Sequence, residues 1–264
     1  MSDDPISYLK AVGEDGPHDI ARAALMLAAL DHPGRPLAPF ASHLAEIADA
    51  MRVETAAIHR VADGAQALAN VLGERFGYDG DRVTYDDPRN ADLMEVIARR
   101  RGLPVALGIL YIHAARAGGM AAQGLNTQGH FLIRITHRHD DVTLDPFNGG
   151  AMLGSEAMPA ALRNAVLAES VSDTDVLLRL QNNLKMRALK EGAHERGLEL
   201  SQRMTLIAPK RADLWFDLGR LHGVAGALGA ARRAYETCLE LARPGEALHN
   251  EAALSLAGLK RRLN

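Results

Sequence analysis

The sequence is poor in the residues that mark several classes of protein. It contains one cysteine, Cys238, which excludes an internal disulfide and a metal site built from cysteines. Aromatic residues make up 4% of the chain, and alanine is abundant, a composition that favours closely packed helices. The 30 Lys and Arg residues are outnumbered by 33 Asp and Glu residues, so the chain lacks the overall basic charge that is typical of nucleic-acid-binding proteins.

Long hydrophobic runs are missing as well. The longest apolar run near the N-terminus covers residues 23–30, between Arg22 and Asp31, whereas a membrane-spanning helix needs about 20 apolar residues. The first five residues, Met1–Pro5, are acidic and lack the basic segment that begins a signal peptide. We therefore expect a cytoplasmic protein with no membrane partner, no nucleic-acid partner and no cofactor.

The length and the hydrophobic pattern indicate a mixed protein of one or two domains. Apolar residues with a period near 3.6 predict helices over 17–30, 40–75 (in two segments), 90–101, 104–117 and 156–168. Alternating apolar and polar residues predict strands near 121–125, 131–136 and 142–146. The last two strands are expected to form a hairpin that turns near residues 138–139.

The most apolar helix is predicted to begin at Pro104. Arg99–Arg101 close the preceding helix, which Asn90 is expected to cap and Gly102 to stop. Proline suits the first position of a helix because it has no N–H group to leave unpaired. The helix is apolar on every side until Gly118–Gly119 ends it, so we expect it to lie at the centre of the core.

The C-terminal part is repetitive. Six residues fit the tetratricopeptide repeat (TPR) pattern, with His222 where tyrosine is usual: Trp215, Leu218, Gly219, His222, Ala231 and Tyr235. Leu184 precedes Leu218 by one repeat length of 34 residues, and Pro209 closes that earlier copy. The pattern predicts about two repeats followed by a capping helix over 247–262.

Two residues of the predicted hairpin can form a catalytic pair. If the hairpin turns near 138–139, His130 and Asp145 are cross-strand neighbours, and directly opposed Cβ atoms lie about 5 Å apart. A carboxylate beside an imidazole fixes its tautomer and supports its charged form, as in the base and orienting residue of a catalytic triad. The alternative is a structural hydrogen bond at the edge of the sheet.

The nucleophile that such a pair would serve is missing. An activated thiol or hydroxyl is favoured at the N-terminus of a helix. The apolar helix begins Gly102-Leu103-Pro104-Val105-Ala106-Leu107, without Cys, Ser or Thr. Cys238 occupies the small-residue position of a repeat, so we expect it to be a buried packing thiol rather than a replacement nucleophile.

Four motifs resemble those of the SirB1 family, a branch of the transglutaminase-like (papain-like cysteine protease) superfamily. They are Tyr85-Asp86-Asp87-Pro88-Arg89-Asn90, Arg100-Arg101-Gly102-Leu103-Pro104, Gly129-His130-Phe131-Leu132 and Asp145-Pro146-Phe147-x-Gly149-Gly150. A TPR-like tail is also what that family carries, so the resemblance covers most of the chain.

The resemblance implies a fold in which a cysteine opens the central helix and a histidine and an aspartate follow on adjacent strands. The histidine falls on His130, the aspartate on Asp145, and the cysteine position at or next to Pro104. The SirB1 branch characteristically has proline there, so the chain follows its family and departs from the enzymes. Gln128 stands where family members often have proline.

Pattern and resemblance together predict an α+β fold. Residues 1–170 are expected to form the transglutaminase-like domain, helical over 1–80 and with a core that contains a small antiparallel sheet over 81–155. Residues 171–264 are expected to form an α-helical TPR-like domain, and the polar stretch Glu169–Asp175 marks the boundary.

Two clusters outside the pair have both a functional and a structural interpretation. His137, His139, Asp140 and Asp141 can bind a divalent metal or form a solvated turn, and we favour the turn, so no metal is expected.

Basic residues around the central helix form the second cluster. Arg89 and Arg99–Arg101 can hold an acidic peptide or a phosphate. The alternative is that they cap helices and pair with the nearby aspartates, and Asn90 can likewise be only a cap.

The preferred hypothesis is a non-catalytic binding or regulatory protein with a protein or peptide partner. Its cleft keeps His130 and Asp145 but lacks the thiol, and its TPR groove either holds the partner or only packs on the first domain. The predicted binding residues are Arg89, Asn90, Arg101, Pro104, His130, Asp145 and Trp215. One alternative is a hydrolase in which His130 activates water and Asp145 orients it; another is a metal-dependent function at residues 137–141.

Overall fold

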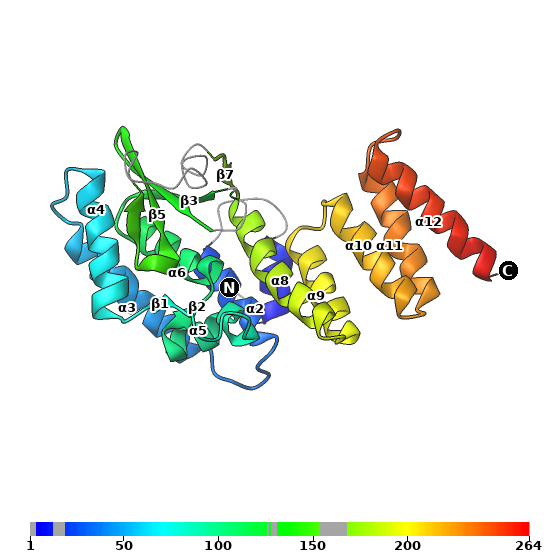
Figure 1. The fold of residues 1–264 in the computed structure, drawn as a ribbon, viewed down its shortest axis with the longest axis horizontal. Coiled ribbons are helices and arrows are strands. Elements are labelled where there is room, and N and C mark those ends of the chain that lie inside the picture. Colours follow the sequence, from blue (N-terminus) through cyan, green and yellow to red (C-terminus); the bar gives the residue numbers. More distant parts are fainter. Residues whose placement is uncertain (1–3, 13–18, 126, 128–130, 154–167, 264) are drawn as a thin grey trace. The chain divides into compact units, whose positions relative to one another are not determined.

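The described residues form two compact units (Figure 1). The structure is a computed structural model that describes residues 4–12, 19–125, 127, 131–153 and 168–263. The first unit extends to Leu180, and the second begins at Gln181 and also includes Leu9–Val12. The division lies inside helix α8 (Asp173–Lys190), further along the chain than the boundary predicted after residue 170. The helix predicted over 156–168 falls almost wholly outside the described residues.

The first unit combines helices with a small antiparallel sheet (Figure 1). Its α-helices are α2 (Ile20–Ala29), α3 (Ala38–Glu54), α4 (Val61–Leu68), α5 (Leu93–Arg99) and α6 (Pro104–Ala117), and the residues of α1 (Pro5–Val12) are divided between the two units after Tyr8. Shorter helical segments are η1 (Ala69–Arg75), η2 (Pro88–Ala91) and η3 (Pro146–Asn148). The sheet has the order β6 (Ala151–Leu153), β5 (Asp140–Asp145), β4 (Ile133–His137), β3 (Ala121–Leu125) and β7 (Ser170–Val171). A parallel pair, β1 (Asp79–Gly80) and β2 (Arg101–Gly102), lies apart from this sheet.

The predicted hairpin is confirmed in its register and its turn. Ile133 of β4 faces Leu144 of β5, and His137 faces Asp140. Arg138 takes a positive φ of 56° in the turn, which is the left-handed conformation that two-residue hairpin turns need. Ile133 and Leu144 are both fully buried, so the alternating pattern turns one face of the hairpin toward the core.

Helix α6 is the centre of the first unit, as its composition predicts. Eleven of its 14 residues are buried, and it contacts α2, α3, α4 and α5 as well as β3 and β4. It begins at Pro104, and Gly118 forms its C-cap. The start and the end of the central helix are therefore as predicted.

The helix before it begins and ends differently from the prediction. Asp92, not Asn90, caps α5, because its Oδ1 accepts a hydrogen bond from the Glu95 N–H group at 3.0 Å. Arg100, not Gly102, adopts the left-handed conformation that ends the helix, with φ of 58°. Gly102 belongs to strand β2 instead, where its lack of a Cβ lets Val96 pack against it. Arginine is rare at a left-handed C-cap, so the sequence around Arg100 gave no indication that the helix ends at this residue.

The second unit is entirely helical in its described part. After the end of α8 it contains α9 (His194–Ile207), α10 (Ala212–Val224), α11 (Leu228–Leu241) and α12 (Ala247–Leu263). Ala231 and Tyr235 of α11 pack with Leu256 and Leu259 of α12 in a buried apolar cluster. Tyr235 also lies so close to Gly219 of α10 that a Cβ there would be 2.7 Å from its ring. This contact explains why the repeat needs glycine and an aromatic residue at these two positions.

No helix within the described residues is both long enough and apolar enough to cross a membrane.

Candidate functional site

Three of the four SirB1-like motifs contact or begin helix α6. Pro104 is the first residue of the helix and is buried. The N–H group of Leu103, just before it, donates to the carbonyl oxygen of Asn90 at 2.8 Å, which ties the first motif to the second. The position where a nucleophile is expected therefore holds a pyrrolidine ring that starts the helix, and the first turn offers no hydroxyl or thiol.

Asp145 ends strand β5 and caps the short helix η3. Its Oδ1 accepts hydrogen bonds from the N–H groups of Phe147 at 3.0 Å and Asn148 at 3.3 Å, and its Oδ2 accepts one from Asn148 Nδ2 at 2.6 Å. The residue is 5% exposed. The carboxylate is thus held in one orientation by its own turn. His130 and Gln128 lie outside the described residues, so the His130–Asp145 pair stays a prediction.

Tyr111 of α6 lies beside this turn, and the sequence reading missed it. Its hydroxyl is buried and has no hydrogen-bond partner among the described residues. Burial raises the pKa of Tyr111, and the nearby carboxylates of Asp145 and Asp79 raise it further. The turn after Asp145 contacts the Tyr111 ring at Gly150, which has a φ of 77°. A Cβ atom at this position would lie 2.7 Å from the ring. The only sequence signal was one hydroxyl group among the otherwise apolar residues 104–112 of α6.

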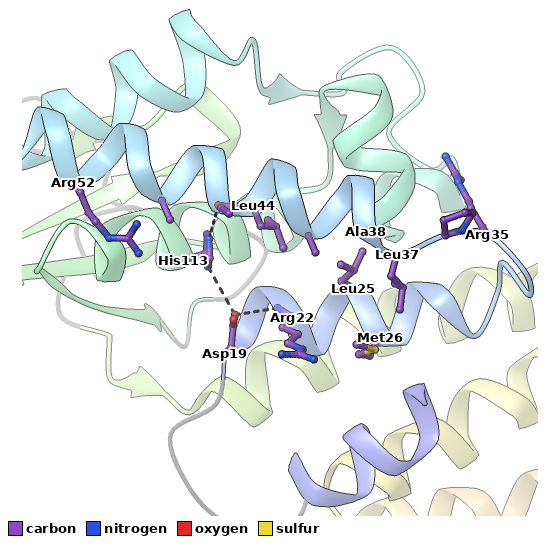
Figure 2. Close-up of a pocket in the computed structure, with 14 residues that line it drawn as sticks. Asp19, Arg22, Leu25, Met26, Arg35, Leu37, Ala38, Leu44, Arg52 and His113 are labelled. Carbon is purple, nitrogen blue, oxygen red and sulfur yellow. Dashed lines mark hydrogen bonds and ion pairs between the residues drawn. The ribbon is translucent and has the colours of Figure 1, made fainter. Parts of the chain in front are cut away.

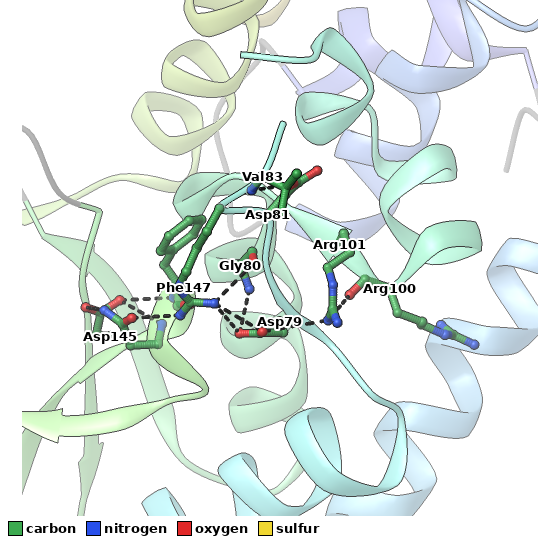
Figure 3. Close-up of polar contacts among 10 residues, drawn as sticks. Asp79, Gly80, Asp81, Val83, Arg100, Arg101, Asp145 and Phe147 are labelled. Atoms are coloured by element: carbon green, nitrogen blue, oxygen red, sulfur yellow. Dashed lines mark hydrogen bonds and ion pairs between the residues drawn. The ribbon is translucent and has the colours of Figure 1, made fainter. Parts of the chain in front are cut away.

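Arg82 joins strand β1 to the turn that follows Asp145, a contact that the sequence did not predict (Figure 3). Its Nη1 lies 3.1 Å from both carboxylate oxygens of Asp79. Its Nη2 donates to the Phe147 carbonyl oxygen at 3.0 Å and to Asn148 Oδ1 at 2.8 Å, and its guanidinium lies 5.0 Å from the centre of the Phe147 ring. One side chain thus fixes strand β1 against the turn that holds Asp145.

The predicted anion-binding arginines have separate partners within the chain. Arg89 pairs with Asp87 at 2.6 Å, and the Asp87 carboxylate also caps η2 by accepting from the Arg89 N–H group. Arg101 lies 3.8 Å from Asp79. These contacts correspond to the capping and salt-bridge alternative, and the role of Arg89 and Arg101 as binding residues stays a prediction.

Asn90 is a structural hub in the described contacts. Fully buried, it donates to the Thr84 carbonyl oxygen at 2.6 Å and accepts from Arg99 at 2.5 Å. Arg99 in turn lies 3.8 Å from Asp81. The hydroxyl and backbone N–H of Thr84, with a smaller contribution from Asn90, lower the pKa of Asp81 to about 2. The loop before α5 is therefore organised by one ionised aspartate and one buried amide.

Arg100 points away from this loop, toward Tyr78 and His43. It donates to the Tyr78 hydroxyl at 2.5 Å, lies 4.9 Å from the centre of the same ring, and contacts the His43 imidazole. Burial raises the pKa of Tyr78 to about 12, although Arg100 opposes the shift. Burial and the positive charge of Arg100 lower the pKa of His43. Arg100 and Arg101 therefore point to different partners and do not form one binding site (Figure 3).

The hairpin tip offers no metal site among the residues that the structure describes. His139, Asp140 and Asp141 are exposed, and Asp141 lies 3.4 Å from Arg134 across the hairpin. No group of three or more His, Cys, Asp or Glu side chains in this part of the chain is placed to hold a metal. The geometry gives the metal-dependent alternative no support.

Trp215 and Cys238 have structural roles in the second unit. The Trp215 indole N–H donates to the Pro209 carbonyl oxygen at 2.7 Å, which ties the end of one repeat to the start of the next. Cys238 is fully buried, and burial raises the pKa of its thiol. The prediction of a packing thiol is confirmed, and a reactive thiolate is disfavoured.

The fold and the site define a transglutaminase-like domain followed by tetratricopeptide repeats. Residues 38–187 match the transglutaminase-like superfamily and residues 184–257 match the tetratricopeptide repeat. Because the first match covers more than half of the chain, the protein belongs to the transglutaminase-like superfamily. Its relatives include proteins named UPF0162, of the SirB1-like family, so the resemblance seen in the sequence is confirmed.

Two of these relatives are bacterial. The UPF0162 protein of Xylella fastidiosa (strain 9a5c) is 28% identical over 187 residues, which are 66% of this chain and 66% of that protein. The UPF0162 protein of Vibrio cholerae is 27% identical over 153 residues, 54% of this chain and 57% of that protein. The chain therefore spans 66% and 57% of the lengths of these two relatives, less than two thirds in both cases.

A shorter match comes from an animal protein. The mouse F-box only protein 21 is 32% identical over 82 residues, 31% of this chain and 13% of that protein.

A transglutaminase-like domain joined to tetratricopeptide repeats fits a role in protein interaction.

Proposed function

We propose that the protein binds a protein or peptide partner and does not act on it chemically. The observation that carries the proposal is Pro104, which begins α6 at or next to the position where the family resemblance places the nucleophile of a cysteine enzyme. The one cysteine of the sequence is Cys238, which is buried in the second unit and does not supply that thiol. A cleft without a nucleophile can still recognise a partner, as can the repeats beside it in the sequence.

The proposed contact surface is a face of the second unit. Met186 of α8, Arg220 of α10 and Leu254 of α12 are spaced by 34 residues each, so they occupy equivalent positions in successive repeats. Met186 is 55% and Leu254 72% exposed, which is unusual for large apolar side chains, and Arg220 occupies the equivalent position of the repeat between them. Equivalent positions of stacked repeats face the same side, so these residues favour a shared apolar contact with a partner. We also retain Trp215 and the cleft residues His130 and Asp145 as proposed contacts.

A paired charge substitution tests this surface. In affinity capture from native cell lysate, the double variant Met186→Glu/Leu254→Glu is expected to capture about tenfold less partner than the wild type. The reason is that apolar side chains buried at an interface supply most of the binding energy. Both side chains are exposed, so the melting temperature should be unchanged.

Val53→Glu is the matched control, since Val53 is 74% exposed on α3 of the first unit. It should capture the same partner as the wild type. Equal capture by the double variant, or no specific partner for the wild type, would contradict the proposal.

A further inference from the structure

A groove runs between α2 and α3, and neither Pro104 nor Asp145 lines it (Figure 2). Its volume is about 720 Å³, which is within the range of small-molecule binding sites. His113, on the second half of α6, closes one end, where its Nε2–H group donates a hydrogen bond to the Leu44 carbonyl oxygen at 3.0 Å. Neither the start of α6 nor the Asp145 turn contributes to this groove.

The floor and one wall of the groove are apolar. Leu25, Met26 and Leu44 are 2%, 3% and 5% exposed and form a closed hydrocarbon floor. Ala41 and Ala45 are exposed on α3, and their short side chains leave the space above the floor open. A ligand that enters the groove therefore buries apolar surface along most of its length.

The rim carries positive charge. Three arginines and one acid line the groove: Arg22, Arg35, Arg52 and Asp19. Arg35 lies at one end and Arg52 at the other, near His113 (Figure 2). Arg35 is engaged by Glu95 at 2.7 Å.

The Arg52 end is the better position for an anionic group. The only ion pair of Arg52 within the described residues is with Asp49 on the same helix, and both side chains are more than half exposed. Such a surface pair contributes little, so Arg52 can exchange Asp49 for the anionic group of a ligand. A ligand with one anionic end and an apolar body would match the groove.

The walls favour a single hydrocarbon chain over a peptide. Both walls are helices, whose backbone groups are paired internally, so an extended peptide would find no hydrogen-bonding edge. A helix as long as the lined part of α3, from Ala38 to Arg52, would be about 21 Å long and 10–12 Å wide, so more than half of its volume would lie outside a groove of about 720 Å³. A single hydrocarbon chain needs neither hydrogen bonds nor that volume. We propose that this groove binds a straight-chain alkyl carboxylate, with its carboxylate at Arg52 and its chain over Leu25 and Leu44.

Isothermal titration of the full chain with dodecanoate, below its micelle concentration, tests the proposal. We expect one saturable site, and decanoate, which is two CH₂ groups shorter, should bind about fifteenfold more weakly, because each buried CH₂ group contributes about fourfold. Arg52→Gln should weaken dodecanoate binding by roughly tenfold. Dodecyltrimethylammonium, which has the same chain and a positive head, should not bind.

A filled groove and a matched control complete the test. Ala45→Trp places a large ring over the floor and should abolish dodecanoate binding, whereas Ser42→Trp, exposed on the same helix outside the groove, should leave it unchanged. The proposal is overturned if dodecanoate does not bind the wild type, if it binds Ala45→Trp as well as Ser42→Trp, or if the cationic detergent binds equally.

Discussion

Replacing Phe131 with alanine is expected to lower the free energy of unfolding of the first unit by about 3–5 kcal/mol. Phe131 directly follows His130 in the sequence, and its side chain is 2% exposed. Its ring fills the space left by two glycines, since a Cβ would lie 2.3 Å from it at Gly108 of α6 and 2.9 Å from it at Gly124 of β3. Removing the ring leaves a cavity between the central helix and the sheet. The free energy of unfolding of the first unit can be measured by hydrogen–deuterium exchange of the α6 amides at increasing denaturant concentration.

Gly108 provides the matching half of a double-mutant cycle. Glycine to alanine inside a helix normally stabilises a protein by about 0.5–1 kcal/mol. In the wild type, Gly108→Ala should instead cost about 1–3 kcal/mol because its methyl group overlaps the Phe131 ring. In the Phe131→Ala background the overlap is gone, and the same substitution should stabilise the protein. Additive effects of the two substitutions would show that the ring and the helix do not meet as described.

Asp145→Ala is expected to lower the free energy of unfolding by about 2 kcal/mol. The substitution removes the acceptor of three hydrogen bonds in the η3 turn and leaves Asn148 Nδ2 without this partner. Asp145→Asn keeps an oxygen for the two backbone N–H groups and should cost about half as much. The measurement is urea denaturation of the three proteins side by side.

The outcome bears on the hydrolase alternative. If Asp145→Ala were as stable as the wild type, the carboxylate would have no structural role, and a role beside His130 would be the better explanation for its burial. If the stability falls as expected, loss of any activity in this variant is not evidence of catalysis.

The main elements of the fold were predictable because their signals are local. The alternation over residues 131–136 determined the face and the register of the hairpin, and the all-round apolar pattern after Pro104 identified the central helix. The tetratricopeptide pattern predicted α10, α11 and the capping helix α12. In each case neighbouring residues in the sequence carry the information that the structure uses.

Parts of the candidate site were not predictable for the opposite reason. Arg82 binds Phe147 and Asn148, which are more than sixty residues away, and nothing near Arg82 in the sequence indicates that contact. Tyr111 is recognisable only once Asp145 and Gly150 lie beside it. These side chains act through long-range contacts, whereas helix caps and turns are determined by adjacent residues.

The loop before α5 shows how tertiary contacts override local rules. Asparagine is a favoured N-cap residue, yet the cap of α5 is two residues after Asn90, at Asp92, whose carboxylate accepts the capping hydrogen bond. Asn90 instead makes hydrogen bonds with Thr84 and Arg99. Arg100 takes the left-handed position while its guanidinium is held by Tyr78 and His43. Both choices depend on partners that the local sequence does not reveal.

The most direct test of the central claim is the mass of the partner after binding. The captured partner is purified, incubated with the wild-type protein at equilibrium, and analysed by intact mass spectrometry after release from the complex. We expect a stable complex from which the partner returns with its mass unchanged. A gain of water from hydrolysis or a loss of ammonia from acyl transfer, present with the wild type and absent with His130→Ala, would contradict the account and establish an enzyme.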